Sequence, residues 1–204
     1  MTDFERRFFE SGKIEIRKAD GGDKPSPTTL RGYAAKFDVL SENLGGFREQ
    51  IAPGAFADVL KDDVRALFNH DANQVLGRTT SGTLRIAQDS TGLYYEVDLP
   101  DTQAARDLEI SINRGDVSQS SFAFRVAPNG DSWDENEDGV IVRTITKFAR
   151  LYDVSPVTYP AYPDATIGTR SMEAWKASRE AATSAINKAK RAAESRRRFL
   201  AINS

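Results

Sequence analysis

The amino-acid sequence predicts an α+β fold that is mainly β, a small antiparallel β-barrel flanked by helices. Short stretches rich in β-branched and aromatic residues recur between residues 13 and 158, and Gly, Pro and Ser clusters separate them. Helical spacing of apolar residues interrupts these stretches only two or three times. Many short strands with few helices are typical of a small barrel or curled sheet. A length of 204 residues allows one main domain with an appendage.

The expected strands follow one another at short intervals, and no internal repeat is visible. They cover residues 13–18, 29–37, 47–51, 64–70, 84–87, 93–99, 120–126, 140–148 and 151–158.

Two helices are expected within the main domain. Pro53 and Gly54 precede a short helix over residues 55–61. A longer helix begins after Asp101 or Thr102, either of which can cap its N-terminus. Its buried face consists of Ala105, Leu108 and Ile112, and Gly115 fits the position after its last turn.

A change of charge divides the chain at Arg170. Residues 171–204 contain 8 Lys or Arg and 3 Asp or Glu, a charge of +5, and subtracting this from the net charge of −2 leaves −7 for residues 1–170. The basic segment is rich in Ala, Lys, Arg and Glu, and Ser171 can cap its start. We therefore predict a domain over residues 1–170 and a basic, Ala-rich helical tail over residues 171–204 whose apolar stripe is thin.

Composition excludes several classes of chemistry. Cysteine is absent and histidine occurs once, so disulfides, thiolate catalysis and the usual zinc and iron–sulfur ligand sets are not available. No apolar run approaches the roughly 20 residues of a membrane-spanning helix, and no phosphate-binding glycine loop is present. We expect a soluble, intracellular protein without a cofactor or metal ion.

One acidic segment has the spacing of a calcium-binding loop only in part. Asp134, Asn136, Asp138 and Gly139 match the start of an EF-hand loop, but Ile145 stands where a bidentate Glu is required. The segment lies between two predicted strands, so a hairpin turn ending in Asp-Gly is the better interpretation.

The single histidine, His70, follows a predicted strand in the segment ALFNHD. Any mechanism that uses imidazole as a base must use this residue. Spacing alone favours a structural role, because lone histidines in loops are common.

A serine and an aspartate could complete a catalytic site with this imidazole. In a strand over residues 118–126, alternation separates a core face from an open face, and Ser121 lies on the open face beside Ala123. Asp153 interrupts an apolar strand, where a carboxylate requires water or a donor such as imidazole Nδ1–H. An edge-strand Asp153 facing water or paired with Arg150, and an edge-strand Ser121 without function, remain open alternatives.

Several segments in order resemble the phage prohead protease family. They are GYAAKFDVLSENLGGFREQIAPGAF, VRALFNHDANQVLGRT, GTLRIAQDSTGLYYEVDLPDT, GDVSQSSFAFRV and DVSPVTYPAYPDA, and they extend to about Arg170. The resemblance implies a serine endopeptidase that cleaves capsid scaffold, or scaffold-like segments of the major capsid protein, inside the prohead in the host cytoplasm. It also implies the barrel of the herpesvirus assemblins.

The resemblance assigns the catalytic residues one by one. His70 matches the family's histidine, Ser121 its nucleophile, and Asp153 the acid of the DVSPVTYPAY segment. Ala123 stands where the family usually has Gly, and Ser120 where Met is common. The sequence does not place the donors for the oxyanion, and the candidates are the backbone amides of residues 157–162 and an arginine such as Arg78. Self-cleavage and homo-oligomer formation are further possibilities.

Two other functions compete with this reading. The first is a catalytically silent scaffold or assembly protein that keeps the protease fold. The second uses the basic tail as a nucleic-acid arm, which the missing recognition motif and the acidic domain disfavour. A tail that tethers the enzyme to capsid or scaffold, or that is itself removed by cleavage, fits the composition better.

Overall fold

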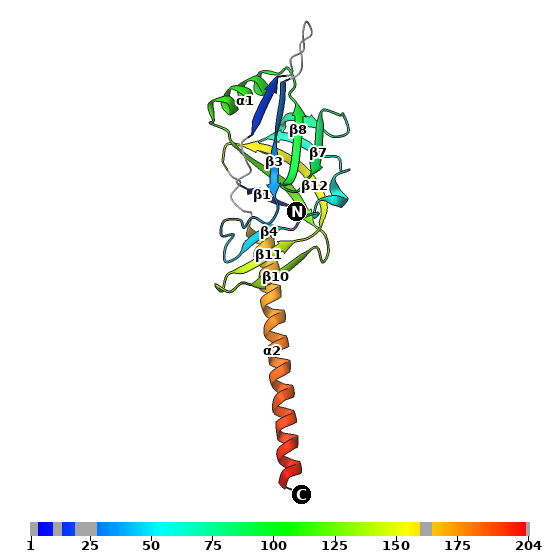
Figure 1. Cartoon of the computed structure of the whole chain (residues 1–204), viewed down its shortest axis with the longest axis vertical. Helices are drawn as coiled ribbons and strands as arrows, with labels where there is room; N and C mark the ends of the chain where they lie inside the picture. The colour runs from blue at the N-terminus through cyan, green and yellow to red at the C-terminus, as the bar shows by residue number, and fades with distance from the viewer. Residues whose placement is uncertain (1–3, 10–13, 19–27, 160–164, 203–204) are drawn as a thin grey trace. The chain divides into compact units, whose positions relative to one another are not determined.

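A computed structural model describes residues 4–9, 14–18, 28–159 and 165–202 of the chain. The chain divides into two compact units, Met1–Ala165 and Thr166–Ser204. The first contains all the strands of the described residues, together with a 3-10 turn and one α-helix (Figure 1).

Twelve strands and three helical segments make up the described residues. The strands are β1 (Glu5–Phe9), β2 (Glu15–Lys18), β3 (Thr28–Lys36), β4 (Arg48–Ile51), β5 (Arg65–Phe68), β6 (Asp71–Arg78), β7 (Leu84–Gln88), β8 (Gly92–Asp98), β9 (Gln119–Val126), β10 (Asp131–Glu135), β11 (Ile141–Ile145) and β12 (Phe148–Val157). The helices are the 3-10 turn η1 (Ala57–Val59), α1 (Gln103–Arg114) and α2 (Ala165–Ile202).

The strands form three sheets and not the single closed antiparallel barrel that the sequence predicts. In the described residues the sheet orders are β1-β9-β12-β5-β6, β2-β3-β8-β7 and β10-β11-β4. Two pairings, β12 with β5 and β11 with β4, are parallel. Alternation of apolar residues indicates that a segment is a strand but not which distant strand it joins or in which direction, so this prediction was wrong.

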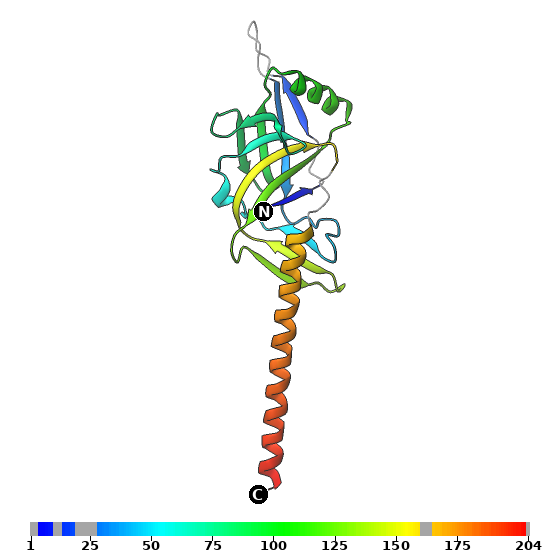
Figure 2. The same cartoon turned by 180° about the vertical axis from the view of Figure 1, so that it is seen from behind.

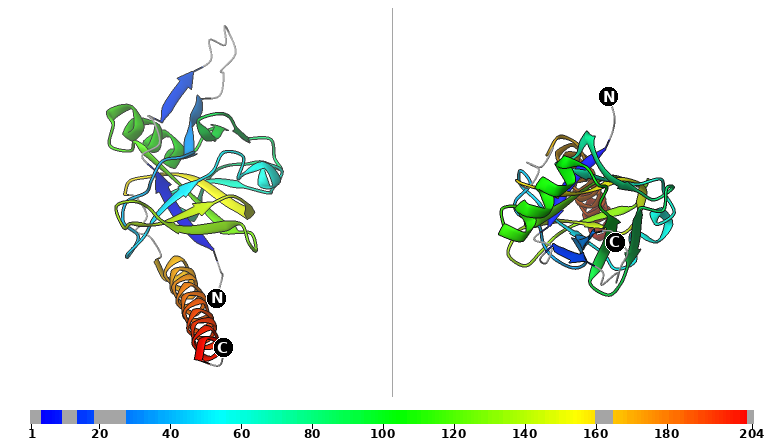
Figure 3. Two further views of the ribbon diagram at one scale, coloured as in Figure 1. Left: turned by 60° about the horizontal axis from the view of Figure 1, so that its bottom comes forward. Right: turned by 90° about the horizontal axis from the view of Figure 1, so that it is seen from above.

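Two long strands dominate the five-stranded sheet. Figure 2 shows β9 in green beside β12 in yellow, and the two pair antiparallel with register shifts near Arg150 and Asp153. The helices α1 and η1 flank the sheets on opposite sides (Figure 3). The mainly β, α+β character of the prediction is therefore confirmed.

An aromatic cluster fills the core. The rings of Phe56 and Phe148 stack with centroids 4.4 Å apart, and those of Phe122 and Phe124 stack at 4.8 Å. Phe124 also meets Phe148 edge-on at 5.0 Å. Such offset and edge-to-face contacts add to the free energy that ring burial contributes. The cluster fixes β9 and β12 against the turn that carries η1.

The longer predicted helix is present with its predicted boundaries. The Thr102 hydroxyl of α1 accepts a hydrogen bond from the Ala105 backbone amide, and Gly115 ends the helix in a left-handed conformation at φ 87°. Ala105, Leu108 and Ile112 are buried, as the spacing predicts. The shorter predicted helix is only the single 3-10 turn η1.

The acidic segment that resembles a calcium loop is a β-hairpin. β10 and β11 pair antiparallel, and the Asn136 side chain accepts hydrogen bonds from the backbone amides of Asp138 and Val140. Gly139 adopts φ 76°, which an L side chain rarely adopts. The turn therefore uses its Asp-Gly pair as expected of a hairpin.

The second unit is the helix α2. It begins at Ala165 and not at the predicted cap Ser171. Residues 176–193 are exposed on all sides, as expected for a helix that is polar all round. No described helix is both long enough and apolar enough to cross a membrane.

Candidate active site

His70 lies in a two-residue turn between β5 and β6. Phe68 pairs with Asp71, so the turn consists of Asn69 and His70 alone, at φ 54° and 56°. Positive φ at both positions defines the type I′ turn, whose twist suits a tight hairpin. For a non-glycine residue this conformation costs about 1 kcal/mol or more, so its surroundings must hold His70 in place.

Asn69 ties this turn to the end of β12. Its backbone amide donates to the Pro156 carbonyl at 3.0 Å. Its side-chain amide donates to the Thr158 hydroxyl at 2.9 Å, and its side-chain oxygen accepts from the Thr158 backbone amide at 2.8 Å. The imidazole is thereby anchored to the strand that carries Asp153.

Ser121 lies in the middle of β9, between two strands. Its neighbours in the sheet are Phe8 of β1 and Ser155 of β12. The face prediction separates Ser121 correctly from the core residues Phe122 and Phe124, but its face is not open. Ser121 is 0% exposed, because His70 and β1 cover it.

Asp153 lies on β12 in the interior of the sheet. It pairs with Ala123 of β9 on one side and with Arg65 of β5 on the other, so it is not an edge residue. Its residue exposure is 7%, and Arg150 is engaged instead with Asp62. The alternative of a water-facing Asp153 paired with Arg150 is therefore wrong.

The structure brings the three predicted side chains together. His70 Nδ1 lies 2.6 Å from Asp153 Oδ1, and His70 Nε2 lies 2.7 Å from Ser121 Oγ. The imidazole thus bridges an alcohol and a carboxylate, with its side chain 5% exposed. This arrangement can move a proton from the alcohol to the ring while the carboxylate stabilises the charged ring.

The carboxylate has a second donor that sequence reasoning missed. The Ser155 hydroxyl, fully buried two residues along β12, donates to Asp153 Oδ1 at 2.8 Å. A buried carboxylate needs such donors to stay charged. The D-x-S spacing in a strand, which puts both side chains on one face, is the signal that could have found it.

A buried tyrosine holds the opposite face of β9. The Tyr95 hydroxyl lies 2.8 Å from the Ser120 hydroxyl, and burial raises the pKa of Tyr95 far above its usual range. The tyrosine is therefore neutral and contributes a hydrogen bond, but no charge, on the face of β9 opposite Ser121.

The expected oxyanion donors are only partly placed. Arg78 donates from Nε and Nη2 to both oxygens of Asp63, at 2.7 and 2.6 Å, which commits its guanidinium to that carboxylate. Hydrogen bonds from Arg78 hold the pKa of Asp63 far below its usual range. Residues 160–162 of the second expected source lie outside the described residues.

A cleft of about 370 Å³ lies beside the His70 turn. The β5–β6 hairpin contributes Phe68, Asn69, Asp71 and Gln74, and α1 contributes Ala104, Asp107, Leu108 and Ser111. The cleft adjoins Asn69, the residue before His70, and two carboxylates, Asp71 and Asp107, line it.

Comparisons with known proteins give a family and a similar solved structure. The bacteriophage T4 capsid assembly protease gp21 superposes on 77% of this chain and 98% of its own with a TM-score of 0.49 and 15% sequence identity. No curated protein matches the chain. Residues 12–178 match the family described as caudovirus prohead serine proteases. Since this match covers most of the sequence and includes all three of the bridged side chains, the chain belongs to that family.

Proposed function

We propose that this chain is a serine endopeptidase in which Ser121 is the nucleophile, His70 the general base and Asp153 the residue that orients the imidazole. The observation that carries the proposal is the pair of short contacts that His70 makes, 2.7 Å to Ser121 and 2.6 Å to Asp153. The burial of all three side chains supports it, because electrostatic effects are larger where water is excluded.

The chemistry is acyl transfer to and from the serine. Ser121 Oγ attacks a peptide carbonyl while Nε2 of His70 takes its proton, and the ring then returns that proton to the leaving amine. Water then attacks the acyl carbon while the same ring takes a proton from it. The bond to Ser121 Oγ breaks, and the ring returns the proton to this oxygen as the acid product leaves. Asp153, held by Ser155, keeps Nδ1 protonated and stabilises the imidazolium formed in each step.

The family description supports an inference about the substrate and the place of action. We infer that the substrate is the capsid scaffold, or a scaffold-like segment of the major capsid protein, cleaved inside the prohead in the host cytoplasm. The likeness to the herpesvirus assemblins, the self-cleavage and the homo-oligomer remain predictions. So does the division into a protease domain over residues 1–170 and a tethering tail over residues 171–204.

The decisive experiment compares the products of capsid proteins in particles made with different variants. We expect Ser121→Ala and His70→Ala to abolish cleavage, a loss of at least about 10⁴-fold in rate. Ser118→Ala is the matched control, since Ser118 is an exposed serine three residues away in the same segment. N-terminal sequencing identifies the cleaved bonds.

The same variants separate the protease from a silent assembly protein. If particles with Ser121→Ala contain the same cleaved products as wild type, the proposal is wrong. If particles assemble with uncleaved capsid protein whether they contain the wild-type chain or a variant, the result favours the catalytically silent assembly protein.

A further inference from the structure

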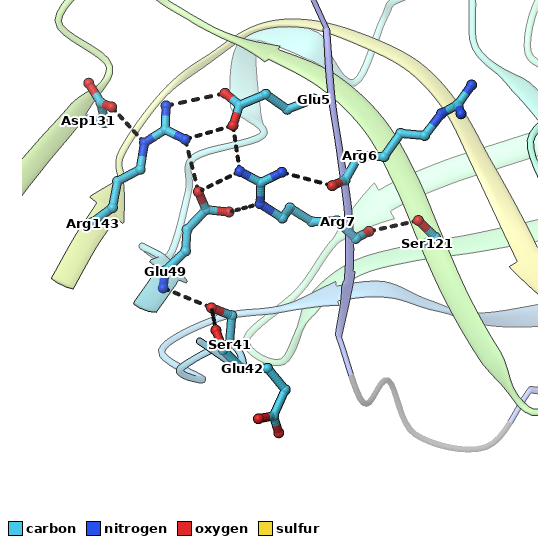
Figure 4. Close-up of polar contacts among 9 residues, drawn as sticks. All are labelled: Glu5, Arg6, Arg7, Ser41, Glu42, Glu49, Ser121, Asp131 and Arg143. Atoms are coloured by element: carbon cyan, nitrogen blue, oxygen red, sulfur yellow. Dashed lines mark hydrogen bonds and ion pairs between the residues drawn. The ribbon is translucent and has the colours of Figure 1, made fainter. Parts of the chain in front are cut away.

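The N-terminal strand β1 covers the nucleophile. It pairs antiparallel with β9 from Glu5 to Phe9, with Phe8 opposite Ser121. The Ser121 hydroxyl is 2.9 Å from the Arg7 backbone carbonyl, which accepts a hydrogen bond from it (Figure 4). With Ser121 fully buried, the polypeptide backbone of β1 occupies the place next to the hydroxyl that a substrate carbonyl must reach.

The edge of β9 is suited to bind any extended polypeptide. In the sheet order β1-β9-β12-β5-β6, removal of β1 would leave β9 as an edge strand with unpaired amides and carbonyls. Extended peptides bind such edges by adding a strand, with affinity from backbone hydrogen bonds and specificity from alternate side chains. A peptide that adds to this edge in place of β1 would run past Ser121 Oγ.

The contact with β1 also diverts the serine proton. Ser121 Oγ carries one proton and has two neighbours, His70 Nε2 at 2.7 Å and the Arg7 carbonyl at 2.9 Å. A carbonyl oxygen can only accept, so the two acceptors compete for that proton. Activation of the hydroxyl by His70 requires the proton to lie toward the ring. β1 therefore covers the nucleophile and weakens its activation together.

A buried cluster of charges holds β1 in place. Glu5 and Arg7 point to the same side of β1, where they meet Glu49 and Arg143 (Figure 4). Arg143 Nη1 donates to Glu49 and Glu5, each at 2.9 Å, and Nε donates to Asp131 at 2.7 Å. Arg7 Nε and Glu49 Oε1 lie 3.0 Å apart in an ion pair that lacks hydrogen-bond alignment.

This cluster makes the occupant specific. Glu5, Arg7, Glu49 and Arg143 are each 3% exposed or less, so an unmatched charge among them would be costly. Once β1 leaves, Glu49 and Arg143 must be matched by the incoming strand or by water. A strand that fits has an acidic residue and, two positions later, a basic residue, in the positions that Glu5 and Arg7 take in β1.

We propose that β1 occupies the site on β9 where a substrate binds as an added strand, and that the Glu5–Arg7–Glu49–Arg143 cluster holds β1 there. The chain is then inactive until an extended polypeptide displaces β1. This inference rests on the proposed function, because a chain can be held inactive by β1 only if it is a protease. The strand site itself can be measured without catalysis. The family match begins at residue 12, after β1, and includes the rest of the site.

The first test measures how fast a serine-directed fluorophosphonate labels Ser121, by intact mass, and how fast a peptide is hydrolysed. Two changes should each increase both rates by at least about tenfold: deletion of residues 2–9, and Arg7→Glu, which sets a carboxylate against Glu49. Each raises the fraction of chains in which β1 does not cover Ser121. Arg48→Glu is the matched control, with the same change of charge on an exposed neighbour of Glu49, and should leave both rates unchanged. Equal rates in wild type and both variants overturn the proposal.

The second test reads binding alone. A fluorescent peptide of residues 2–9, TDFERRFF, should bind the Ser121→Ala chain that lacks residues 2–9, measured by anisotropy, and the peptide with Arg7→Glu should bind at least about tenfold more weakly. If the first peptide binds selectively but no variant ever labels or hydrolyses, the proposed function fails and the strand site stands. Equal binding of the two peptides, or none, overturns the inference while leaving the protease function intact.

Hydrogen exchange of the unaltered chain removes any dependence on how the variants fold. The amides of β1 should exchange through openings that leave β12 protected. If β1 is protected as strongly as β12, the strand leaves only on global unfolding, and the proposal is wrong.

Discussion

His70 is held in a conformation that its own backbone disfavours. Two successive residues in the left-handed backbone conformation form the turn, and the second of them, His70, contributes the imidazole of the site. Strain of this kind persists where the surroundings fix it, and here the Asn69–Thr158 contacts do so. The chain could have used Asn-Gly for the same turn, but glycine would place no side chain between Ser121 and Asp153.

The backbone strain at Asn69 can be measured separately from its clamp, by which we mean the hydrogen bonds between its side chain and Thr158. Asn69→Gly removes the clamp but permits the left-handed backbone, whereas Asn69→Ala removes the clamp and also disfavours that backbone. We expect Asn69→Ala to lower the free energy of unfolding by about 1 kcal/mol more than Asn69→Gly, measured by urea denaturation. Asn129, at φ 58°, offers a matched pair outside the site. Equal stability of the two Asn69 variants would contradict this account.

The hydroxyl of Ser155 should matter for turnover and not for substrate binding. Ser155→Ala removes a donor to Asp153 and should lower kcat about fivefold to tenfold, roughly 1 kcal/mol, with little change in KM. Ser120→Ala, which removes a buried hydroxyl on the opposite face of β9, should lower thermal stability more than kcat. A change in KM alone for Ser155→Ala would place Ser155 in substrate binding instead.

The residues of the site differ in how far sequence reasoning could reach them. His70 can be picked out because it is the single histidine of the sequence, and alternation within one strand separates Ser121 from the aromatic core. The resemblance links these two with Asp153. Asn69 and Arg7 act through contacts with segments far apart in the chain, which no local pattern encodes. Ser155 differs, because its D-x-S spacing from Asp153 is a local pattern.

At the scale of elements, the predictions succeed where periodicity is strong. The helix α1 has an amphipathic face and both caps in its own sequence, and these determine its boundaries. Three strands, β1, β6 and β10, were not predicted. Their sequences ERRFF, DANQVLGR and DSWDE are rich in polar and charged residues and lack a regular apolar alternation. They become strands because they pair with neighbours that pattern analysis cannot supply.

The hairpin of β7 and β8 should lose an ion pair on acidification. Hydrogen bonds from Arg85, the largest cause, lower the pKa of Asp98 from its usual value. A carboxyl with a lowered folded-state pKa contributes stability above the unfolded pKa of about 3.9, and this contribution is lost as pH falls through the lower folded value. Asp98 is partly exposed, so the contribution is under about 1 kcal/mol.

The variant that tests this contribution is Asp98→Asn. Denaturant unfolding should show it less stable than wild type near pH 7 and equal to wild type at the acid end of the series. The difference should also shrink at high salt, because the pair is screened. A difference that is constant with pH would assign the effect to packing and not to charge.

At the scale of the whole molecule, charge and structure divide the chain near the same place. The charge changes sign after Arg170, and the compact units meet between Ala165 and Thr166. A chain that ends at Arg170 should retain the thermal stability of the first unit and its peptide hydrolysis, and should be incorporated less into proheads. Loss of hydrolysis by this truncation would mean that residues 171–204 belong to the folded protease.

The order of strands in the five-stranded sheet has a consequence for the timing of synthesis. His70 and Ser121 leave the ribosome well before β12, which brings Asp153 and the Pro156 and Thr158 anchors of the histidine turn. Contacts between segments this distant form late, since the intervening loop must close first. A partly translated chain consequently lacks the His70–Asp153 contact. Under the proposed function it should not cleave neighbouring nascent proteins until β12 has emerged.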